Sequence, residues 1–503
     1  MSERQMTRSE KLKWNTVTSL INQTVTLVCG FILSRYILTC FGSAQNGLIS
    51  SIGQFLGLIS FCELGVGAVV QSTLYKPLAD EDNSAVSRVM VSANRFFNRI
   101  GMILAIYVAV LLATYPFIYL DRFGYMSTAT LIVTMAITYF AQYFFGIKNQ
   151  ILLNADQRSY VGLLLQSSTT VLNTAVSICI MSAGASIQTV KLVTSLIFLL
   201  RPLGLTIYVK KKYRIDYNIK LGGEPIEQKW NGLAQHMAAV VLGNTDTVVL
   251  SLCSTLANVS VYNVYFMVVN GVKQIVTSAT TGIQAMFGNM LAKNEREALD
   301  LSFGTVEWIL HTATVLIFTV TGLLIIPFVR IYTYGITDAD YIVPNFSVLI
   351  VAATGAYCIR LPYSMMVLAA GHYKETQTSA IIEMVLNIII SVVAVFRFGL
   401  IGVAIGTLVS MSYRTVYFVM YLKKNIICRG LNHFIKHMAV DVLTVAAIIM
   451  SVYRFSLSDI SYLAWIILAV KTFTVAFAIT LLINLLCYKR ETLGCIKAVL
   501  RIK

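Results

Sequence analysis

Long runs of apolar residues, separated by short polar breaks, cover most of this chain. Reading these runs along the sequence predicts about fourteen helical segments. They lie at roughly 14–39, 46–75, 98–120, 127–152, 160–183, 188–209, 231–254, 260–291, 305–332, 344–370, 377–396, 400–422, 438–454 and 461–487. Crossing a bilayer takes about 20 predominantly apolar residues, so segments of this length are typical of membrane spans. The pattern predicts an all-α polytopic membrane protein whose spans are joined by short loops.

Several short motifs recur at a nearly constant distance along the chain. Lys-Trp-Asn at 13–15 returns at 229–231. Four further matches keep almost the same offset in numbering: Gly67 with Gly282, Pro116 with Pro327, Asn173 with Asn387, and Arg201 with Arg414. Independent chance matches would scatter, so the steady offset indicates an internal repeat. Six predicted spans separate the copies, so both halves enter the membrane from the same side as parallel repeats.

The repeat predicts how the chain is divided. An N-terminal six-helix bundle with its cytoplasmic linker would cover 1–229, and a second six-helix bundle would cover 230–425. Two additional helices and a basic tail would occupy 426–503, outside the repeat. Two similar bundles with a seam between them are typical of transporters in which one half rocks against the other.

Composition agrees with a membrane protein and orients it. Hydrophobic residues make up 57% of the 503 residues and charged residues 12%, against about 25% charged in a soluble domain. The net charge of +16 is best explained by cytoplasmic loops, since placing the N-terminus inside puts about 27 of the 39 Lys and Arg residues on the cytoplasmic side. We therefore expect both termini in the cytoplasm, no cleaved signal peptide and no nucleic-acid partner. The nine cysteines form no C-x-x-C motif, and we expect no metal site.

Polar residues recur at helical spacing in the first two predicted spans of each half. The set includes Asn15 and Asn22 in the first span and Asn270 and Lys273 in the eighth. A polar face cannot point at lipid cheaply, so it either packs against other helices or lines a water-filled cavity. Its presence in corresponding spans of both halves favours a shared cavity.

Basic residues outnumber acidic ones inside the predicted spans, which suits an anionic substrate group such as a diphosphate. We expect Lys273 to be the first substrate contact, because it combines the polar face with a mid-span position. The other expected contacts are Arg35, Lys148, Arg360, Asn22 and Asn270. For each charged residue the alternative is a structural ion pair between helices. Arg201 and Arg414 are expected to share an architectural role.

Two acidic residues are candidates for coupling to an ion gradient. Asp246 would either pair with Lys273 as a structural bridge or act as a protonatable site, and Glu63 is a second candidate. His236 and His311 fall inside predicted spans without an evident partner. The chain has no Walker A motif, so we expect no nucleotide cofactor and no ATP hydrolysis.

Two stretches carry a family resemblance. "LSRYILTCFGSAQNGLISSIGQFLGLISFCELGVGAVVQSTLYKPLAD" at 33–80 and "GNTDTVVLSLCSTLANVSVYNVYFMVVNGV" at 243–272 resemble bacterial O-antigen and capsule polysaccharide flippases. These belong to the multidrug/oligosaccharidyl-lipid/polysaccharide exporter superfamily. Asn46 departs from many of its members, which have a tyrosine before the glycine.

The resemblance implies a MATE/lipid-flippase-like fold and a transporter of the bacterial plasma (inner) membrane. Its substrate would be an undecaprenyl-diphosphate-linked oligosaccharide, flipped by alternating access and coupled to an ion gradient or the membrane potential. Membrane lipids, a polysaccharide polymerase and a chain-length regulator are the implied partners. The glycan stays open among O-antigen, lipopolysaccharide and capsule units.

Two other functions stay open from the sequence. A multidrug or cation antiporter of the same superfamily would usually have twelve spans and an acidic site. A membrane-embedded polysaccharide polymerase or acyltransferase would usually show a long external loop or an intramembrane catalytic histidine. The short loops and the absence of an evident partner for His311 disfavour an enzyme.

Overall fold

The computed structural model is built from helices and divides into two compact units. It describes residues 8–63, 65–219, 233–280, 282–427, 429 and 431–500. All regular secondary structure in these residues is helical, which confirms the predicted fold class. The boundary of the units falls between Val240 and Val241, inside one helix. The second Lys-Trp-Asn, at 229–231, lies outside the described residues.

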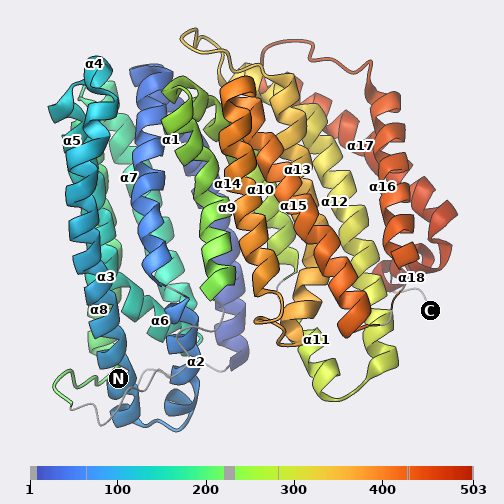
Figure 1. Cartoon of the computed structure of the whole chain (residues 1–503), viewed down its shortest axis with the longest axis horizontal. Helices are drawn as coiled ribbons and strands as arrows, with labels where there is room; N and C mark the ends of the chain where they lie inside the picture. Colours follow the sequence, from blue (N-terminus) through green and yellow to red (C-terminus); the bar gives the residue numbers. More distant parts are fainter. Residues whose placement is uncertain are drawn as a thin grey trace. The chain divides into compact units, whose positions relative to one another are not determined.

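Unit 1 consists of long helices linked by short turns (Figure 1). Its helices are α1 (Arg8–Gly57), a 3₁₀ turn (Leu58–Glu63), α2 (Val66–Ala79), α3 (Asn83–Ile118), α4 (Leu120–Phe123), α5 (Tyr125–Ala141), a π turn (Gln142–Gly146), α6 (Ile147–Ala155), α7 (Ser159–Ser182) and α8 (Ile187–Lys212). Helix α1 packs along α7, and α5 packs along α3 and α8.

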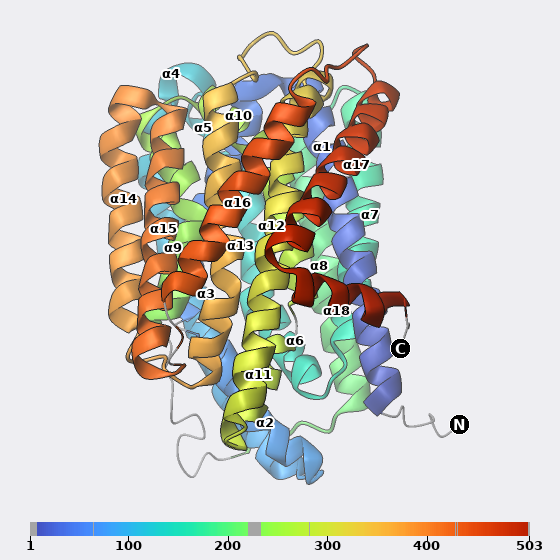
Figure 2. The same ribbon diagram turned by 90° about the vertical axis from the view of Figure 1, so that its right-hand side faces the viewer.

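Unit 2 has a similar helical plan with an addition at its C-terminal end. Its helices are α9 (Leu233–Cys253), α10 (Leu256–Ala279), α11 (Ile283–Ala292), α12 (Arg296–Tyr332), α13 (Pro344–Ala369), α14 (Gln377–Phe398), α15 (Leu400–Asn425), α16 (Leu431–Val452), α17 (Tyr462–Cys487) and α18 (Lys489–Leu500). Helices α16 and α17 both pack on α12, and Figure 2 shows α18 leaving the direction of α17.

Twelve helical stretches of the described residues are long and apolar enough to cross a membrane. One of them, Lys13–Glu63, spans 51 residues and covers the first predicted span, 14–39, and the first part of the second, 46–75. Helix α1 is in fact two helices meeting at Gly42, whose φ of 79° and ψ of 175° are not helical. Counting these separately gives thirteen stretches, and the 24-residue α10, at the predicted eighth span, is a further long helix outside that set. The chain is a multi-pass membrane protein.

Turns with left-handed backbone repeat between the two halves. Five positive-φ residues of unit 1 have a positive-φ counterpart in unit 2 at nearly the offset of the sequence motifs: Gly65 and Gly282, Glu81 and Asn294, Gly124 and Gly335, Gln157 and Gly371, and Gly184 and Gly399. Helices α8 and α15 are each 26 residues long, and their first residues, Ile187 and Leu400, follow the same offset. The repeat seen in the sequence therefore appears in the backbone as well.

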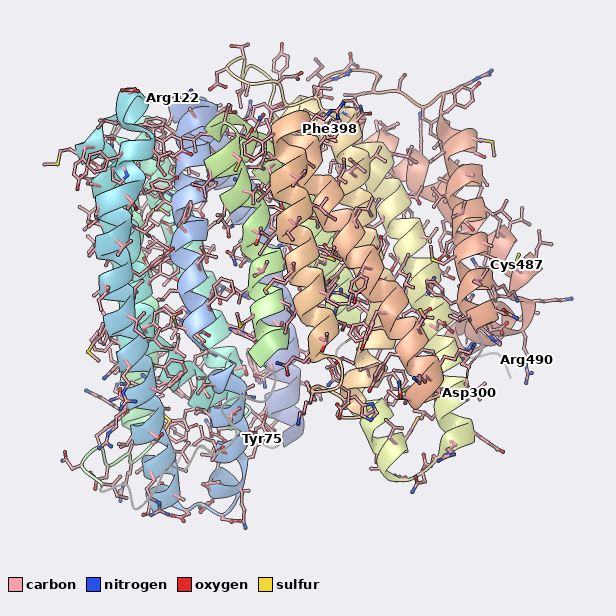
Figure 3. All side chains as sticks on the ribbon, in the orientation of Figure 1. Tyr75, Arg122, Asp300, Phe398, Cys487 and Arg490 are labelled. Atoms are coloured by element: carbon pink, nitrogen blue, oxygen red, sulfur yellow. The ribbon has the colours of Figure 1, made fainter. Side chains whose placement is uncertain are left out.

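Each unit has its loops gathered at two opposite ends. Figure 3 shows Tyr75 and Arg122 at opposite ends of unit 1, and Asp300 and Phe398 at opposite ends of unit 2. Charged residues gather in the turn after α2 (Asp80, Glu81 and Asp82), in the turn after α11 (Lys293 and Glu295) and in the last turn of α15 (Lys423 and Lys424). Charged groups inside the bundles are therefore the exceptions that need a partner or a function.

Candidate functional site

Lys273 and Arg360 share one aromatic ring inside unit 2. The ammonium of Lys273, on α10, lies 4.2 Å from the ring centroid of Tyr357. Tyr357 lies on α13, and Arg360 follows it by one turn on the same helix. The guanidinium of Arg360 lies 4.9 Å from the same centroid. Two residues predicted separately as substrate contacts are thus held together by an aromatic face, a favourable partner for a cation. Asn270 is half-buried one turn before Lys273 on α10.

A fully buried carboxylate anchors the two arginines of this cluster. Glu383 on α14 accepts from Arg360 through one oxygen and from Arg414 on α15 through the other. Glu383 is 0% exposed, and both arginines are buried. The sequence analysis named Arg360 and Arg414, but only the fold shows that both pair with Glu383 in one ion cluster. Arg360 therefore has the ion pair that was the alternative considered for it, and its contact with substrate stays a prediction.

Glycines allow the two helices that hold this carboxylate to approach closely. A Cβ at Gly406 of α15 would lie 2.2 Å from the Ser391 hydroxyl of α14. A Cβ at Gly402 would lie 2.4 Å from the backbone of Ala394. Small residues at such positions are how membrane helices gain packing contacts without a hydrophobic driving force. The close α14–α15 contact fixes the position of Glu383 relative to Arg414.

The cluster has an excess of positive charge. Lys273, Arg360 and Arg414 supply three cations, and Glu383 supplies one carboxylate. Within the described part of the chain, Lys273 has no carboxylate at ion-pair distance. The resulting charge of +2 is costly in a low-dielectric interior unless water or an anion compensates it. This is the chemistry of an anion-binding group of residues.

Asp246 is held by hydroxyl groups and not by Lys273. Tyr262 donates to its Oδ2 at 3.0 Å, and Thr407 lies 2.8 Å and 3.0 Å from its two oxygens. Asn387 donates in turn to Thr407 at 3.1 Å. The described contacts of Asp246 therefore do not include the bridge to Lys273 that we considered. A buried carboxylate with hydroxyl partners and no cation is the arrangement expected of a protonatable residue.

The candidates in unit 1 have separate partners. Glu63 accepts from Tyr143 at 2.8 Å, and Lys148 donates to Asn94 while lying 5.6 Å from the ring centroid of Tyr217. Asn22 accepts from Ser167 of α7 at 3.1 Å. Arg35 is half-buried in the first part of α1. None of these contacts joins two of the predicted residues within this unit.

The first Lys-Trp-Asn attaches the start of α1 to the turn between α6 and α7. Asn15 donates to the carbonyl oxygen of Gln157 and accepts from the backbone N–H of Tyr160, both at 2.9 Å. The ring of Trp14 lies 6.4 Å from that of Tyr160. Asn15 therefore serves as an anchor for this turn. We had expected it to begin a face directed toward the cavity.

An ion cluster at Asp156 strengthens the same attachment. Lys11 lies 2.9 Å and Arg158 2.6 Å from its carboxylate oxygens, and Tyr213 donates to it as well. Burial raises the pKa of this carboxyl, but the hydrogen bonds from Tyr213 and Lys11 and the charges of Lys11 and Arg158 outweigh burial, so the pKa lies below its ordinary value. Asp156 is therefore an ionised structural residue outside the predicted cavity.

One buried group was misread from the sequence. His311 has two close partners, Asp441 at 2.6 Å and Tyr363 at 3.0 Å, although no partner was evident along the chain. Glu307 and Asp441 were also missed as buried charges, because they lie near the ends of predicted spans. Only the packing of α13 and α16 on α12 brings these residues together.

No family model matches the chain, and no curated protein sequence matches it. Comparison with solved structures gives extensive matches. The lipid II flippase MurJ, in an inward closed conformation, superimposes with a TM-score of 0.70 and 14% identity, over 95% of this chain and 99% of MurJ. The fold is similar to that of MurJ.

Multidrug transporters of the MATE family share a smaller part of the fold. An inward-facing MATE transporter matches with a TM-score of 0.56 and 16% identity, over 80% of this chain and 96% of its own length. A MATE transporter from Vibrio cholerae matches with a TM-score of 0.54 and 16% identity, over 84% and 98%. MurJ thus matches a larger share of this chain than either MATE transporter does.

Proposed function

We propose that this protein is a flippase that moves a lipid-diphosphate-linked oligosaccharide across the bacterial plasma membrane. The observation that carries the proposal is the group formed by Lys273, Arg360, Arg414 and Glu383 around Tyr357, with its excess charge of +2. A diphosphate diester carries two negative charges and would balance this excess. Arginine binds phosphate oxygens through paired N–H groups, and lysine binds them as a point charge.

The fold supports a transporter of lipid substrates over an antiporter of cations. MurJ is named as a lipid II flippase, and its fold matches nearly the whole of this chain. A multidrug or cation antiporter is the second candidate, since MATE transporters share the fold. A cation substrate would face the three cations of the Lys273 group, which disfavours its binding.

We assign the halves of the chain as follows. The bundles 1–229 and 230–425 are the two parts that move in alternating access, and 426–503 supplies additional helices beside which a long lipid tail could lie. Arg35, Lys148, Asn22 and Asn270 remain proposed contacts for the headgroup or sugars. Asp246 and Glu63 remain proposed coupling residues, and a polysaccharide polymerase and chain-length regulator remain proposed partners.

Reconstitution into lipid vesicles tests the function directly. A fluorescent undecaprenyl-diphosphate-linked oligosaccharide is placed in both leaflets, and the fraction accessible to an external enzyme is followed over time. We expect the protein to accelerate exchange of this lipid and not to transport ethidium, a cationic drug. Transport of ethidium without lipid exchange would identify an antiporter and refute the flippase.

A charge reversal tests the site within the same assay. Lys273→Glu changes the excess charge from +2 to neutral, so lipid exchange should fall by at least tenfold at equal amounts of folded protein. The matched control is Lys293→Glu, an exposed lysine in the turn after α11. An equal fall in lipid exchange in both variants would show that Lys273 is not a substrate contact, but it would not exclude the flippase function.

A further inference from the structure

A continuous chain of hydrogen-bonding groups connects α12, α13 and α16 in unit 2. Asp441 Oδ2 lies 2.6 Å from His311 Nδ1, and His311 Nε2 lies 3.0 Å from the Tyr363 hydroxyl. That hydroxyl lies 2.8 Å from Glu307 Oε1. Glu307 and His311 are each 1% exposed, Tyr363 is 2% exposed and Asp441 is 8% exposed. The chain has three links and ends on a carboxylate at each side.

Counting hydrogens shows that this chain binds one additional proton. An ionised carboxylate only accepts, a neutral histidine has one N–H, and a tyrosine has one O–H. Three links need three hydrogens, and the neutral His311 and Tyr363 supply two. With both carboxylates ionised, all three links form only if His311 carries hydrogen on both ring nitrogens. Removing that proton leaves one link without a hydrogen.

The neighbouring charges favour the same protonation. Arg429 NH2 lies 3.1 Å from Glu307 Oε2, and the Arg429 guanidinium also lies near Asp300, which is exposed. The carboxylates of Glu307 and Asp441 and the guanidinium of Arg429 together carry a net charge of −1 when His311 is neutral. A protonated His311 between the carboxylates brings it to zero, which is the cheapest state for buried charges.

Other titratable groups face the chain from α16 and α17. His437 Nε2 lies 3.6 Å from Glu307 Oε2, and its Nδ1 lies 2.9 Å from the Tyr488 hydroxyl. Lys436 lies over the Tyr488 ring at 4.6 Å. His437 is therefore the competing place for a proton. Its ring lies 5.0 Å from that of His311, but it takes part in none of the three links.

A cavity lies beside Arg429 and His437, the two residues that contact Glu307 at one end of the chain. Its volume is about 670 Å³, and its lining includes Arg429, His433, Lys436, His437 and Tyr488. It is large and polar enough to hold water beside His437 and Arg429. Protons could therefore exchange between water in this cavity and Glu307, with Tyr363 relaying them to His311.

We propose that Asp441, His311, Tyr363 and Glu307 form a single-proton coupling site that joins the unrepeated helix α16 to α12 and α13. One proton bound at His311 completes the three links. Its release to water breaks one link, leaves a net negative charge in the buried group and weakens the attachment of α16. The proton site itself does not depend on the proposed function, whereas its use in coupling rests on the flippase assignment.

Nitrogen NMR of ¹⁵N-histidine-labelled protein tests the site without any substrate. The chain has five histidines, so each can be assigned by one substitution. At pH 7.5, where exposed histidines are mostly neutral, we expect His311 to show hydrogen on both nitrogens. A neutral His311, or a doubly protonated His437 in its place, would overturn the proposal.

Two near-isosteric variants test the hydrogen count. Tyr363→Phe removes the two links made by the Tyr363 hydroxyl, and Asp441→Asn supplies an additional donor, so in both variants the remaining links no longer need the proton. We expect the doubly protonated His311 signal to be lost at pH 7.5 in each. The control is Thr314→Val, one turn along α12, because the Thr314 hydroxyl is buried without a hydrogen-bond partner. If Tyr363→Phe still shows the signal of doubly protonated His311, the hydrogen count is wrong.

The vesicle exchange assay tests whether the proton site is used in coupling, which is a separate question from whether the site binds a proton. The wild type and Thr314→Val should change their exchange rate with pH over the range in which His311 loses its proton, and Tyr363→Phe should lose this pH dependence. An identical pH profile for Tyr363→Phe and the wild type would overturn the coupling role. Since the NMR result is obtained without substrate, a protein that exchanges no lipid would refute the proposed function and leave the proton site standing.

Discussion

The ammonium of Lys273 and the ring of Tyr357 lie 4.2 Å apart, and this contact places an uncompensated cation inside unit 2. The ring also lies below Arg360, so it positions two cations at once. A cation–π contact contributes about 0.5–2 kcal/mol. We predict that Tyr357→Leu weakens binding of undecaprenyl diphosphate in detergent by roughly 2- to 30-fold, because the two cations lose their common support.

The control for this variant is Tyr357→Phe, which keeps the ring and removes only the hydroxyl. It should bind the lipid as the wild type does. If Phe and Leu weaken binding equally, the hydroxyl is the important group and the cation–π explanation is wrong.

Glu383 is the residue whose loss should damage folding most. Glu383→Gln removes the carboxylate that pairs with both Arg360 and Arg414, and breaking a buried ion pair in this way costs about 3–5 kcal/mol. We predict a large fall in the thermal unfolding temperature of the purified protein. The double variant Glu383→Leu with Arg414→Met should lose less than the sum of its two single variants, since Glu383→Leu alone takes the carboxylate from the buried Arg414 and the double variant removes that arginine as well.

Asp156 should make the stability of unit 1 depend on pH. Its pKa is lower in the folded protein than in the unfolded chain, so its contribution is present above the unfolded value of about 3.9 and is lost as pH falls through the folded value. Asp156→Asn should therefore destabilise the protein by about 1–3 kcal/mol at pH 7 and by less at an acidic pH below about 3.9. Thermal unfolding at both pH values measures this, and an equal loss at both would contradict the ionic explanation.

The repeated turns predict opposite effects of glycine and alanine at equivalent positions. Gln157 has a φ of 58° and Gly371 a φ of 77°, where a Cβ is strained. Gly371→Ala should cost about 1–2 kcal/mol from backbone strain alone, because no atom lies within 4 Å of the added Cβ. Gln157→Gly should be neutral or stabilising by up to about 1 kcal/mol. Thermal unfolding of both variants checks the pair, and a destabilising Gln157→Gly would show that its side chain matters more than its backbone.

The spans were predictable because apolar length depends only on local sequence. Even the break inside α1 was visible as a polar interruption beside Gly42. The ion cluster was not predictable, because Glu383 lies 23 residues from Arg360 and 31 from Arg414 and meets them only when three helices pack. His311 was misread for the same reason, since Asp441 lies 130 residues away. Helical spacing shows which residues share one face of a helix. It does not show which residues of other helices pack against that face.

The matched turns have a consequence for how the two halves have diverged. Arg201 and Arg414 occupy equivalent positions, yet the residue that stands in the first half where Glu383 stands in the second is Thr169. The Thr169 hydroxyl donates to the Leu165 carbonyl of its own helix, and Arg201 Nε has no hydrogen-bond partner among the described residues. The first half thus has an arginine at the repeated position, but the glutamate that pairs with the equivalent arginine is present only in the second half. The two halves therefore share the positions of their backbone turns but differ in the buried charged residues that they contain.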